Sequence, residues 1–197
     1  MNFVHTKKAD LKTGKWAGGT TTQLAIFPET AQYQQFNFQF RISYATVQVP
    51  ESTFTFMPGV TRHLLILAGD LEIEHENKYK KKLHKFDIDI FNGEWATKAK
   101  GKVTDFNLMT TGGTSGSLEA QYVQTNTIYS ILPNPRINYT GIYLYKGDMQ
   151  LKTSEQNIQL ESGDFILITQ PITTSLQVEG VTNSELIISR IKSGGVN

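Results

Sequence analysis

Two arginines in this 197-residue chain are placed where they could bind an anion together. Residues 36–44 read Phe-Asn-Phe-Gln-Phe-Arg-Ile-Ser-Tyr, so in a strand Arg41 and Ser43 share the face opposite to the aromatic side chains. Arg62 follows a Pro-Gly turn and precedes the most apolar stretch of the chain. A guanidinium is a planar fork that grips both oxygens of a carboxylate. The two arginines therefore predict a carboxylate site.

A second alternating segment, residues 105–109, carries Asp105 and Asn107 on one face and apolar residues on the other. If both segments line one barrel, the polar groups converge in its lumen. Asp105 and Asn107 would then hold the arginines or accept a hydrogen bond from a ligand N–H, in a site for a small anionic molecule. Two alternatives remain open. Arg41 and Asp105 could form a structural ion pair, or the polar faces could meet solvent, as one face of an antiparallel sheet often does.

Three further side chains qualify as site residues. Trp16 and Trp95 could form walls of a pocket, although aromatic residues in β proteins usually belong to the core. Glu94 is a candidate acid or base, but it directly follows an Asn-Gly turn, where carboxylates are usually solvated, and nothing pairs it with a nucleophile.

The histidines do not have the spacing of a metal site. The chain contains only His5, His63, His75 and His84, and it has no cysteine. Their spacings do not bring three imidazoles together, as first-row metal sites require. We therefore expect neither a metal nor another cofactor. The missing cysteines also exclude disulfides, thiolate zinc sites and a cysteine nucleophile.

The elements that must position these residues are predicted to be strands. Alternation with period two recurs along the chain, no segment has a convincing helical stripe, and turn signals recur about every 8 to 15 residues. A weak internal repeat relates residues 65–73 to residues 143–151, each around a Gly-Asp pair. The stretch 110–117 is rich in Gly, Ser and Thr and suits a linker. These features favour an all-β protein made of two jelly-roll halves, residues 1–112 and 113–197.

Composition excludes several classes of function. Nineteen basic and 18 acidic side chains leave a net charge of +1, which argues against nucleic-acid binding. The lysine-rich residues 78–85 are interpreted as a solvated hairpin tip. There is no apolar run of the length of a signal peptide or a membrane helix, so we expect a soluble, cytoplasmic protein without membrane contact.

Five motifs in series resemble the HutD/Ves family: residues 16–24, 40–45, 54–62, 91–95 and 105–109. The resemblance implies a bicupin, with two double-stranded β-helix barrels in one chain, and a small-molecule pocket in the N-terminal half. For HutD proteins it implies binding of an intermediate of histidine degradation such as N-formylglutamate, with a governing role over that pathway. Ves relatives are linked to stress responses.

One motif departs from the family. Its glycine-rich run usually ends near a glutamate, whereas this chain has Gln23, so the fold transfers better than the substrate. The predicted ligand-binding residues are Trp16, Gln23, Arg41, Ser43, Arg62, Glu94, Asp105 and Asn107.

Three functions remain open for these residues. The first is a binding or regulatory module for a small carboxylate, in which no reaction is catalysed. The second is a metal-independent isomerase or hydrolase with Glu94 or Asp105 as general base. The third is a structural protein with a vestigial pocket. A homodimer through exposed strand edges is also plausible.

Overall fold

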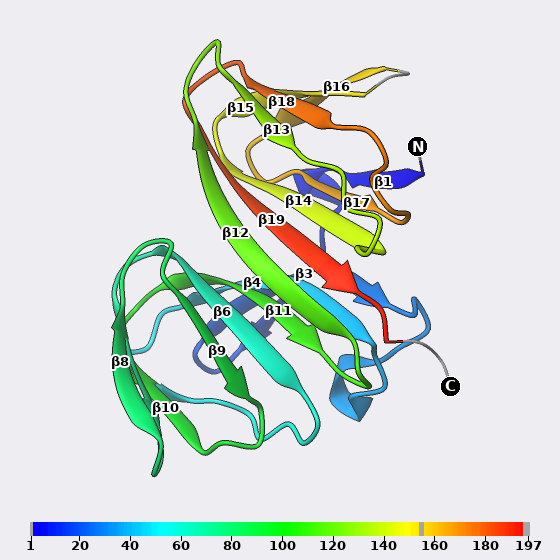
Figure 1. The fold of residues 1–197 in the computed structure, drawn as a ribbon. Coiled ribbons are helices and arrows are strands. Elements are labelled where there is room, and N and C mark those ends of the chain that lie inside the picture. Colours follow the sequence, from blue (N-terminus) through cyan, green and yellow to red (C-terminus); the bar gives the residue numbers. More distant parts are fainter. Residues whose placement is uncertain (1, 154–155, 195–197) are drawn as a thin grey trace. The chain divides into compact units, whose positions relative to one another are not determined.

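The computed structural model describes residues 2–153 and 156–194, and it consists of strands and two short 3-10 turns (Figure 1). The chain divides into two compact units. The N-terminal unit is Lys12–Ser115, and the C-terminal unit is Gly116–Ser193 together with the segment up to Leu11. Each unit contains two β-sheets, as expected for a bicupin.

The N-terminal unit has a six-stranded sheet in the order β2-β3-β4-β11-β6-β9 and a four-stranded sheet in the order β5-β10-β7-β8. All pairings within these sheets are antiparallel. The strands are β2 (Thr13–Trp16), β3 (Gly19–Phe27), β4 (Phe40–Val47), β5 (Glu51–Thr53), β6 (Thr61–Ala68), β7 (Leu71–His75), β8 (Tyr79–Leu83), β9 (Ile88–Asn92), β10 (Thr97–Lys100) and β11 (Thr104–Thr110).

The C-terminal unit has a five-stranded sheet in the order β1-β17-β14-β19-β12 and a four-stranded sheet in the order β13-β18-β15-β16. Its strands are β1 (Phe3–Thr6), β12 (Ser115–Val123), β13 (Ile128–Ile131), β14 (Tyr139–Lys146), β15 (Asp148–Lys152), β16 (Asn157–Glu161), β17 (Phe165–Ile168), β18 (Leu176–Gly180) and β19 (Ser184–Lys192).

The two units repeat one topology. The order β4-β11-β6-β9 in one unit corresponds to β12-β19-β14-β17 in the other, and β5-β10-β7-β8 corresponds to β13-β18-β15-β16. The repeated Gly-Asp pairs stand at the equivalent turns, β6 to β7 and β14 to β15. Gly69 and Gly147 both have a left-handed backbone, with φ of 81° and 87°, which favours glycine. The sequence repeat thus reflects duplication of the whole unit.

The segment before Leu11 belongs to the C-terminal unit because β1 pairs with β17. The carboxylate of Asp164, which precedes β17, fixes this segment: it accepts hydrogen bonds from Lys7 Nζ at 2.9 Å and from the Lys8 N–H at 3.0 Å, and it lies 3.1 Å from His5 Nε2. Burial opposes ionisation of Asp164, but these donors outweigh it and the pKa of Asp164 is lowered. The sequence division had grouped residues 1–11 with the other half, since β1 carries no local signal for its distant partner.

The outer face of the four-stranded sheet in the N-terminal unit explains the lysine-rich residues 78–85. Cross-strand neighbours alternate in charge along two rows: Lys82, Glu72, Lys100 and Glu51, and then Lys80, Glu74 and Lys98. Two of these pairs are ion pairs, Lys80 with Glu74 at 2.8 Å and Lys100 with Glu51 at 3.2 Å. Opposite charges in facing positions favour this strand register. Lys80 and Lys82 therefore belong to a solvated sheet face.

Two segments differ from the expected secondary structure, one from an expected strand and one from an expected linker. Residues 36–39 precede β4, because Tyr33–Gln35 form a 3-10 turn and Phe36 adopts a left-handed backbone with φ of 52°. The expected linker over residues 110–117 is shorter in the structure: only residues 111–114 separate β11 from β12, with Gly112 and Gly113 in left-handed conformations.

The described part of the chain has no helix with the length and apolar character that a membrane span requires.

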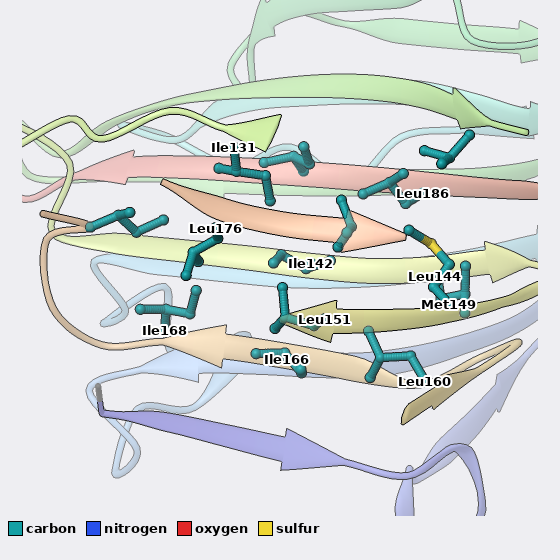
Figure 2. Close-up of a cluster of buried hydrophobic side chains, with 14 residues drawn as sticks. Ile131, Ile142, Leu144, Met149, Leu151, Leu160, Ile166, Ile168, Leu176 and Leu186 are labelled. Atoms are coloured by element: carbon teal, nitrogen blue, oxygen red, sulfur yellow. The ribbon is translucent and has the colours of Figure 1, made fainter. Parts of the chain in front are cut away.

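The interiors of the two units differ in chemistry. In the C-terminal unit the space between the sheets is filled by fourteen buried apolar side chains, among them Ile142, Leu144, Met149 and Leu186 (Figure 2). The N-terminal unit has a smaller aliphatic cluster, including Leu64, Ile66 and Ile73. A second apolar cluster contains Phe38, Met57, Val60 and Met109, and buried polar side chains such as Arg41, Arg62, Asp105 and Asn107 lie in the same unit. The N-terminal unit therefore combines an apolar core with buried charged and polar side chains.

Candidate functional site

A cavity of about 750 Å³ opens in the N-terminal unit. Its walls come from β2, β3, β4, β5, β6 and β11 and from the Tyr33–Gln35 turn. This volume lies within the range of small-molecule sites, roughly 300–1,000 Å³. Most of the floor is the inner face of the six-stranded sheet.

The strand register explains why polar groups gather on this floor. Directly opposite residues on antiparallel strands point to the same face. Three such rows cross β3, β4, β11 and β6 on the inner face: Ile26, Arg41, Met109 and Arg62; then Gln23, Ser43, Asn107 and Leu64; then Thr21, Ala45, Asp105 and Ile66. Met109 therefore separates the two arginines in their row. On the opposite face of β4, Phe40 and Ile42 are fully buried and Tyr44 is partly buried.

Arg41 is held in place by its neighbours. Its Nε donates to Gln23 Oε1 at 2.9 Å, and its Nη1 donates to Ser43 Oγ at 3.0 Å. The guanidinium lies 4.3 Å from the ring centroid of Tyr33. Burial lowers the pKa of Arg41, although it stays a cation at neutral pH. These contacts leave part of the fork, including Nη2, available to a ligand.

Arg62 is more deeply buried, with 7% of its surface exposed. Its guanidinium lies 4.6 Å from the Phe54 ring centroid and 5.3 Å from that of Phe91, which restrict its position. Its Nη2 lies 3.5 Å from Asn107 Oδ1, the outer limit of a hydrogen bond. Its buried Nε has no partner among the described residues. Burial lowers the pKa of Arg62 to about 10. Arg62 is thus a charged group whose donors are largely unused.

Asp105 and Asn107 form a chain toward Arg62. Asn107 Nδ2 donates to Asp105 Oδ1, and Asn107 Oδ1 faces Arg62. Burial raises the pKa of Asp105 to about 7, against the opposing effects of the Asn107 hydrogen bond and the Arg62 charge. No ion pair joins Arg41 to Asp105 in the described residues, because Gln23 and Ser43 hold Arg41 instead. The structural ion pair considered from the sequence is therefore wrong.

Seven of the eight predicted site residues line the cavity: Trp16, Gln23, Arg41, Ser43, Arg62, Asp105 and Asn107. Glu94 does not. Its Oε1 instead accepts a hydrogen bond of 3.0 Å from the N–H of Gly59, so it closes the neighbouring turn and is exposed to solvent. Glu94 follows β9, beyond the strand rows that form the floor, so the structure does not bring it together with the other predicted residues.

The glycine-rich motif positions Trp16 at the cavity. A Cβ on Gly18 would lie 2.0 Å from the Trp16 ring, so the indole folds directly over this glycine. A Cβ on Gly19 would lie 1.9 Å from the carbonyl oxygen of Thr46, which shows how closely β3 and β4 approach. Trp16 keeps 44% of its surface exposed. Gly18 and Gly19 are therefore required for this packing.

The profile of the HutD family matches residues 8–186, most of the chain. This chain belongs to the HutD family. Among proteins with curated descriptions, none matches its sequence. The resemblance of the five motifs to HutD is thereby confirmed.

Solved structures share the fold of this HutD-family chain. A conserved protein of unknown function from Pseudomonas aeruginosa PAO1 aligns with a TM-score of 0.83 at 15% identity, over 98% of this chain and 100% of that one. HutD from Pseudomonas fluorescens SBW25 (formate condition) aligns with a TM-score of 0.76 at 14% identity, over 98% and 100%. The pirin YhhW of Escherichia coli, in complex with nickel(II), aligns with a TM-score of 0.71 at 8% identity, over 98% and 100%. Together with the two repeated units, these similarities establish the all-β bicupin fold.

The cavity of this HutD-family chain does not fit a metal ion. Its described lining carries four cationic side chains (Lys12, Lys15, Arg41 and Arg62), several hydroxyls and amides, and one carboxylate, that of Asp105. A guanidinium cannot ligate a cation. In the described residues no three His, Cys, Asp or Glu side chains gather as a metal site would require. His63 points away from the cavity on the opposite face of β6 and is buried, which lowers its pKa.

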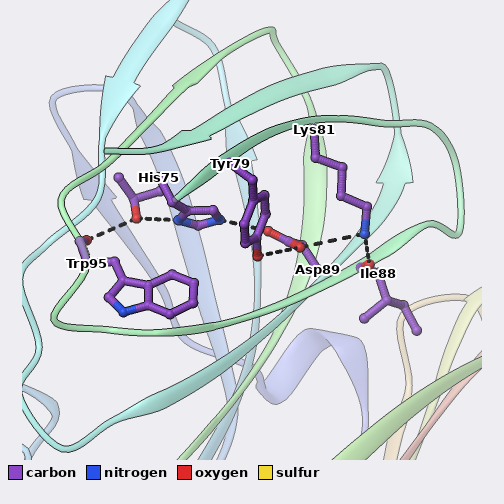
Figure 3. Close-up of polar contacts among 7 residues, drawn as sticks. His75, Tyr79, Lys81, Ile88, Asp89 and Trp95 are labelled. Carbon is purple, nitrogen blue, oxygen red and sulfur yellow. Dashed lines mark hydrogen bonds and ion pairs between the residues drawn. The ribbon is translucent and has the colours of Figure 1, made fainter. Parts of the chain in front are cut away.

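Trp95, also predicted as a wall of the pocket, belongs to a different cluster of the N-terminal unit, which contains buried polar side chains (Figure 3). At its centre, His75 Nε2 lies 2.9 Å from Asp89 Oδ2, and His75 Nδ1 lies 2.8 Å from Thr97 Oγ1. Tyr79 donates to the other oxygen of Asp89 at 3.1 Å. His75 and Asp89 are 1% and 4% exposed, so this cluster joins β7, β8, β9 and β10 without opening to a ligand.

Several residues that line the cavity of the N-terminal unit are not predicted from the sequence. Tyr33, which faces Arg41, lies in an irregular glutamine-rich segment without periodicity. Phe54, which stacks on Arg62, belongs to a motif that was recognised, although its role was not. Lys12 and Lys15 at β2 have no signal beyond their charge. The excess of basic residues before Trp16 is the one cue that could have indicated them.

Proposed function

We propose that the N-terminal unit of this HutD-family protein binds a small carboxylate metabolite, N-formylglutamate or a related acid, and that the bound state regulates histidine utilisation. One observation carries the proposal: two buried guanidiniums present unused donors to a cavity of about 750 Å³. Unsatisfied buried donors are costly, and a ligand carboxylate would satisfy them.

The charge of the cavity supports an anionic ligand. Its described lining includes Lys12, Lys15, Arg41 and Arg62 but a single acid, Asp105. The whole chain has a net charge of only +1. Concentrating cations in a cleft with apolar walls attracts anions and accelerates their capture. The ligand must therefore carry at least one carboxylate or an equivalent anionic group.

A thermal-unfolding screen tests the binding. Formate, glutamate, pyroglutamate, N-formylglutamate, urocanate and histidine are compared at equal concentration and pH. A ligand at about 100 times its dissociation constant adds roughly 2.7 kcal/mol to the free energy of unfolding. For a chain of this length the melting temperature should rise by about 5–10 °C. We expect a rise with one or more carboxylates that is lost in Arg41→Ala. A rise with none of the acids would contradict the proposal.

Tryptophan fluorescence should report binding directly. The chain has two tryptophans, Trp16 at the cavity and Trp95 beside His75. A ligand that covers the half-exposed Trp16 should shift its emission to shorter wavelength. We expect the shift to persist in Trp95→Phe and to vanish in Trp16→Phe. A shift that depends on Trp95 instead would place the ligand elsewhere.

A second candidate function is a metal-independent isomerase or hydrolase with Asp105 as general base. It is favoured by the burial that raises the pKa of Asp105 to about 7, a value suited to proton transfer near neutral pH. Glu94 has no part in it, since it lies outside the cavity. Incubating the acids with the protein and analysing them by NMR separates the candidates. Turnover that is lost in Asp105→Asn would favour the enzyme, and unchanged ligands would favour the binding module.

A further inference from the structure

Asp105 is an unusual neighbour for an anion site. Of the described residues that line the cavity, it alone is acidic, and 6% of its surface is exposed. Its Oδ1 accepts from Asn107, while its Oδ2 has no hydrogen-bond partner among the described residues. Directly opposite in the register are Ala45 on β4 and Ile66 on β6, which offer no compensation for a negative charge.

The charged and titratable groups that line the cavity with Asp105 come from four elements. Arg62 on β6 is the cation whose charge opposes the rise in the pKa of Asp105, and Asn107 connects the two side chains. Arg41 on β4, Tyr33 in the 3-10 turn, and Lys12 and Lys15 at β2 complete the set around the cavity. An ionised Asp105 would thus be buried with only indirect compensation.

We propose that Asp105 couples anion binding in this cavity to the uptake of one proton: the protonated carboxyl donates a hydrogen bond to the bound carboxylate, whereas the ionised carboxylate repels it. The inference rests on the proposed binding of a carboxylate. Asp105 is then a specificity residue: the cavity accepts the negative charge of the ligand only when the Asp105 carboxylate has taken up a proton.

The physical chemistry of the two forms supports this role. A neutral carboxyl turns Oδ2 into a donor for an anion, and an O–H···O⁻ hydrogen bond is among the stronger ones in proteins. Ionised, the same oxygen can only accept, and it also weakens the field of Arg62. Burial raises the pKa of Asp105 to about 7, so both forms are populated near neutral pH in the free protein. A bound anion shifts this balance further toward the protonated form.

The consequence is a predicted dependence of affinity on pH. If only the protonated form binds and its pKa is about 7, the affinity falls roughly tenfold between pH 6 and pH 8. The carboxylates of the ligand are fully ionised throughout this range, and the pKa of Arg62, about 10, keeps its guanidinium charged. Asp105 is therefore the cavity group expected to titrate there.

The test is calorimetric titration of N-formylglutamate and, separately, formate into the full chain at pH 6, 7 and 8. At pH 8 it is repeated in buffers of different ionisation enthalpy, which reveals proton uptake. We expect the wild type to lose about tenfold in affinity over this range and to take up nearly one proton at pH 8. Asp105→Asn keeps the shape and a donor, and its affinity should vary less than twofold with no proton uptake.

The outcomes separate the two proposals. Wild-type binding that is equally tight at all three pH values, or a pH slope that persists in Asp105→Asn, overturns the proton coupling and leaves carboxylate binding intact. Binding of neither acid at pH 6 overturns both.

The free protein provides a check without ligand. Because the pKa of Asp105 is raised on folding above its ordinary value of 3.8, the folded state binds the proton more tightly. Its contribution to stability is therefore present below about pH 4 and is lost as pH rises toward 7. The wild type should lose more stability over this range than Asp105→Asn. Identical pH profiles of the two proteins would overturn the assignment.

Discussion

Replacing His75 with alanine is expected to lower the free energy of unfolding of the N-terminal unit by about 3–5 kcal/mol. The imidazole bridges Asp89 and Thr97 through both ring nitrogens, in a region where His75 and Asp89 are almost fully buried. Removing it leaves the Asp89 carboxylate with Tyr79 and a more distant Lys81, and it opens a void among aromatic rings.

Both tryptophans belong to the N-terminal unit, so urea unfolding followed by tryptophan fluorescence reports on this unit. The matched control is His84→Ala. His84 also lies 2.8 Å from an aspartate, Asp70, but their side chains are 67% and 79% exposed. Exposed pairs of this kind contribute about 0–1 kcal/mol. Equal losses in the two variants would contradict a structural role for the buried cluster.

Arg62→Met is expected to weaken carboxylate binding by about 100-fold or more, since losing one partner of a buried charge pair costs roughly 2–5 kcal/mol. Methionine preserves much of the apolar stem and places an apolar thioether near the rings of Phe54 and Phe91, over which the guanidinium lies in the wild type. Without ligand, the same change should leave stability unaltered or increase it. The free protein buries a guanidinium whose Nε has no partner in the described residues, and replacing buried charge by apolar groups is often neutral or stabilising.

Calorimetry and urea unfolding of the same variant measure the two effects. Arg62→Lys keeps the charge without the planar fork and should fall between wild type and Arg62→Met. Arg136→Met, an exposed arginine of the C-terminal unit, is the control and should bind within about twofold of wild type. If Arg62→Met bound like wild type, the carboxylate would have to lie away from Arg62.

The inner face of the cavity could be predicted because alternation assigns residues to faces without knowledge of the partner strand. Arg41, Ser43, Asp105 and Asn107 have the right parity, and antiparallel pairing of β4 with β11 brings them together. The odd or even position of a residue predicts its face only within a strand, and not the direction of side chains beyond the end of the strand. Glu94 lies beyond β9, where a turn redirects it to the N–H of Gly59.

Other contacts, in the site and in the buried His75 cluster, leave no periodic pattern in the sequence. His75 occupies a core position of β7, and nothing in its local sequence indicates that Asp89 and Thr97 meet it there. Tyr33 reaches Arg41 from an irregular turn. Such contacts follow from long-range packing and could not be predicted from segments considered one at a time.

The pairing of β1 with β17 has a consequence for how the chain is made. His5 contacts Asp164, 159 positions later in the sequence. At about 5–20 residues per second, ribosomal synthesis delivers the partner of β1 roughly 10–30 s after β1 itself. Lys12–Ser115 is translated entirely within that interval and forms its own compact unit. Pairing of β1 with β17 therefore occurs late in synthesis. Until then the backbone N–H and C=O groups of β1 have no partner strand.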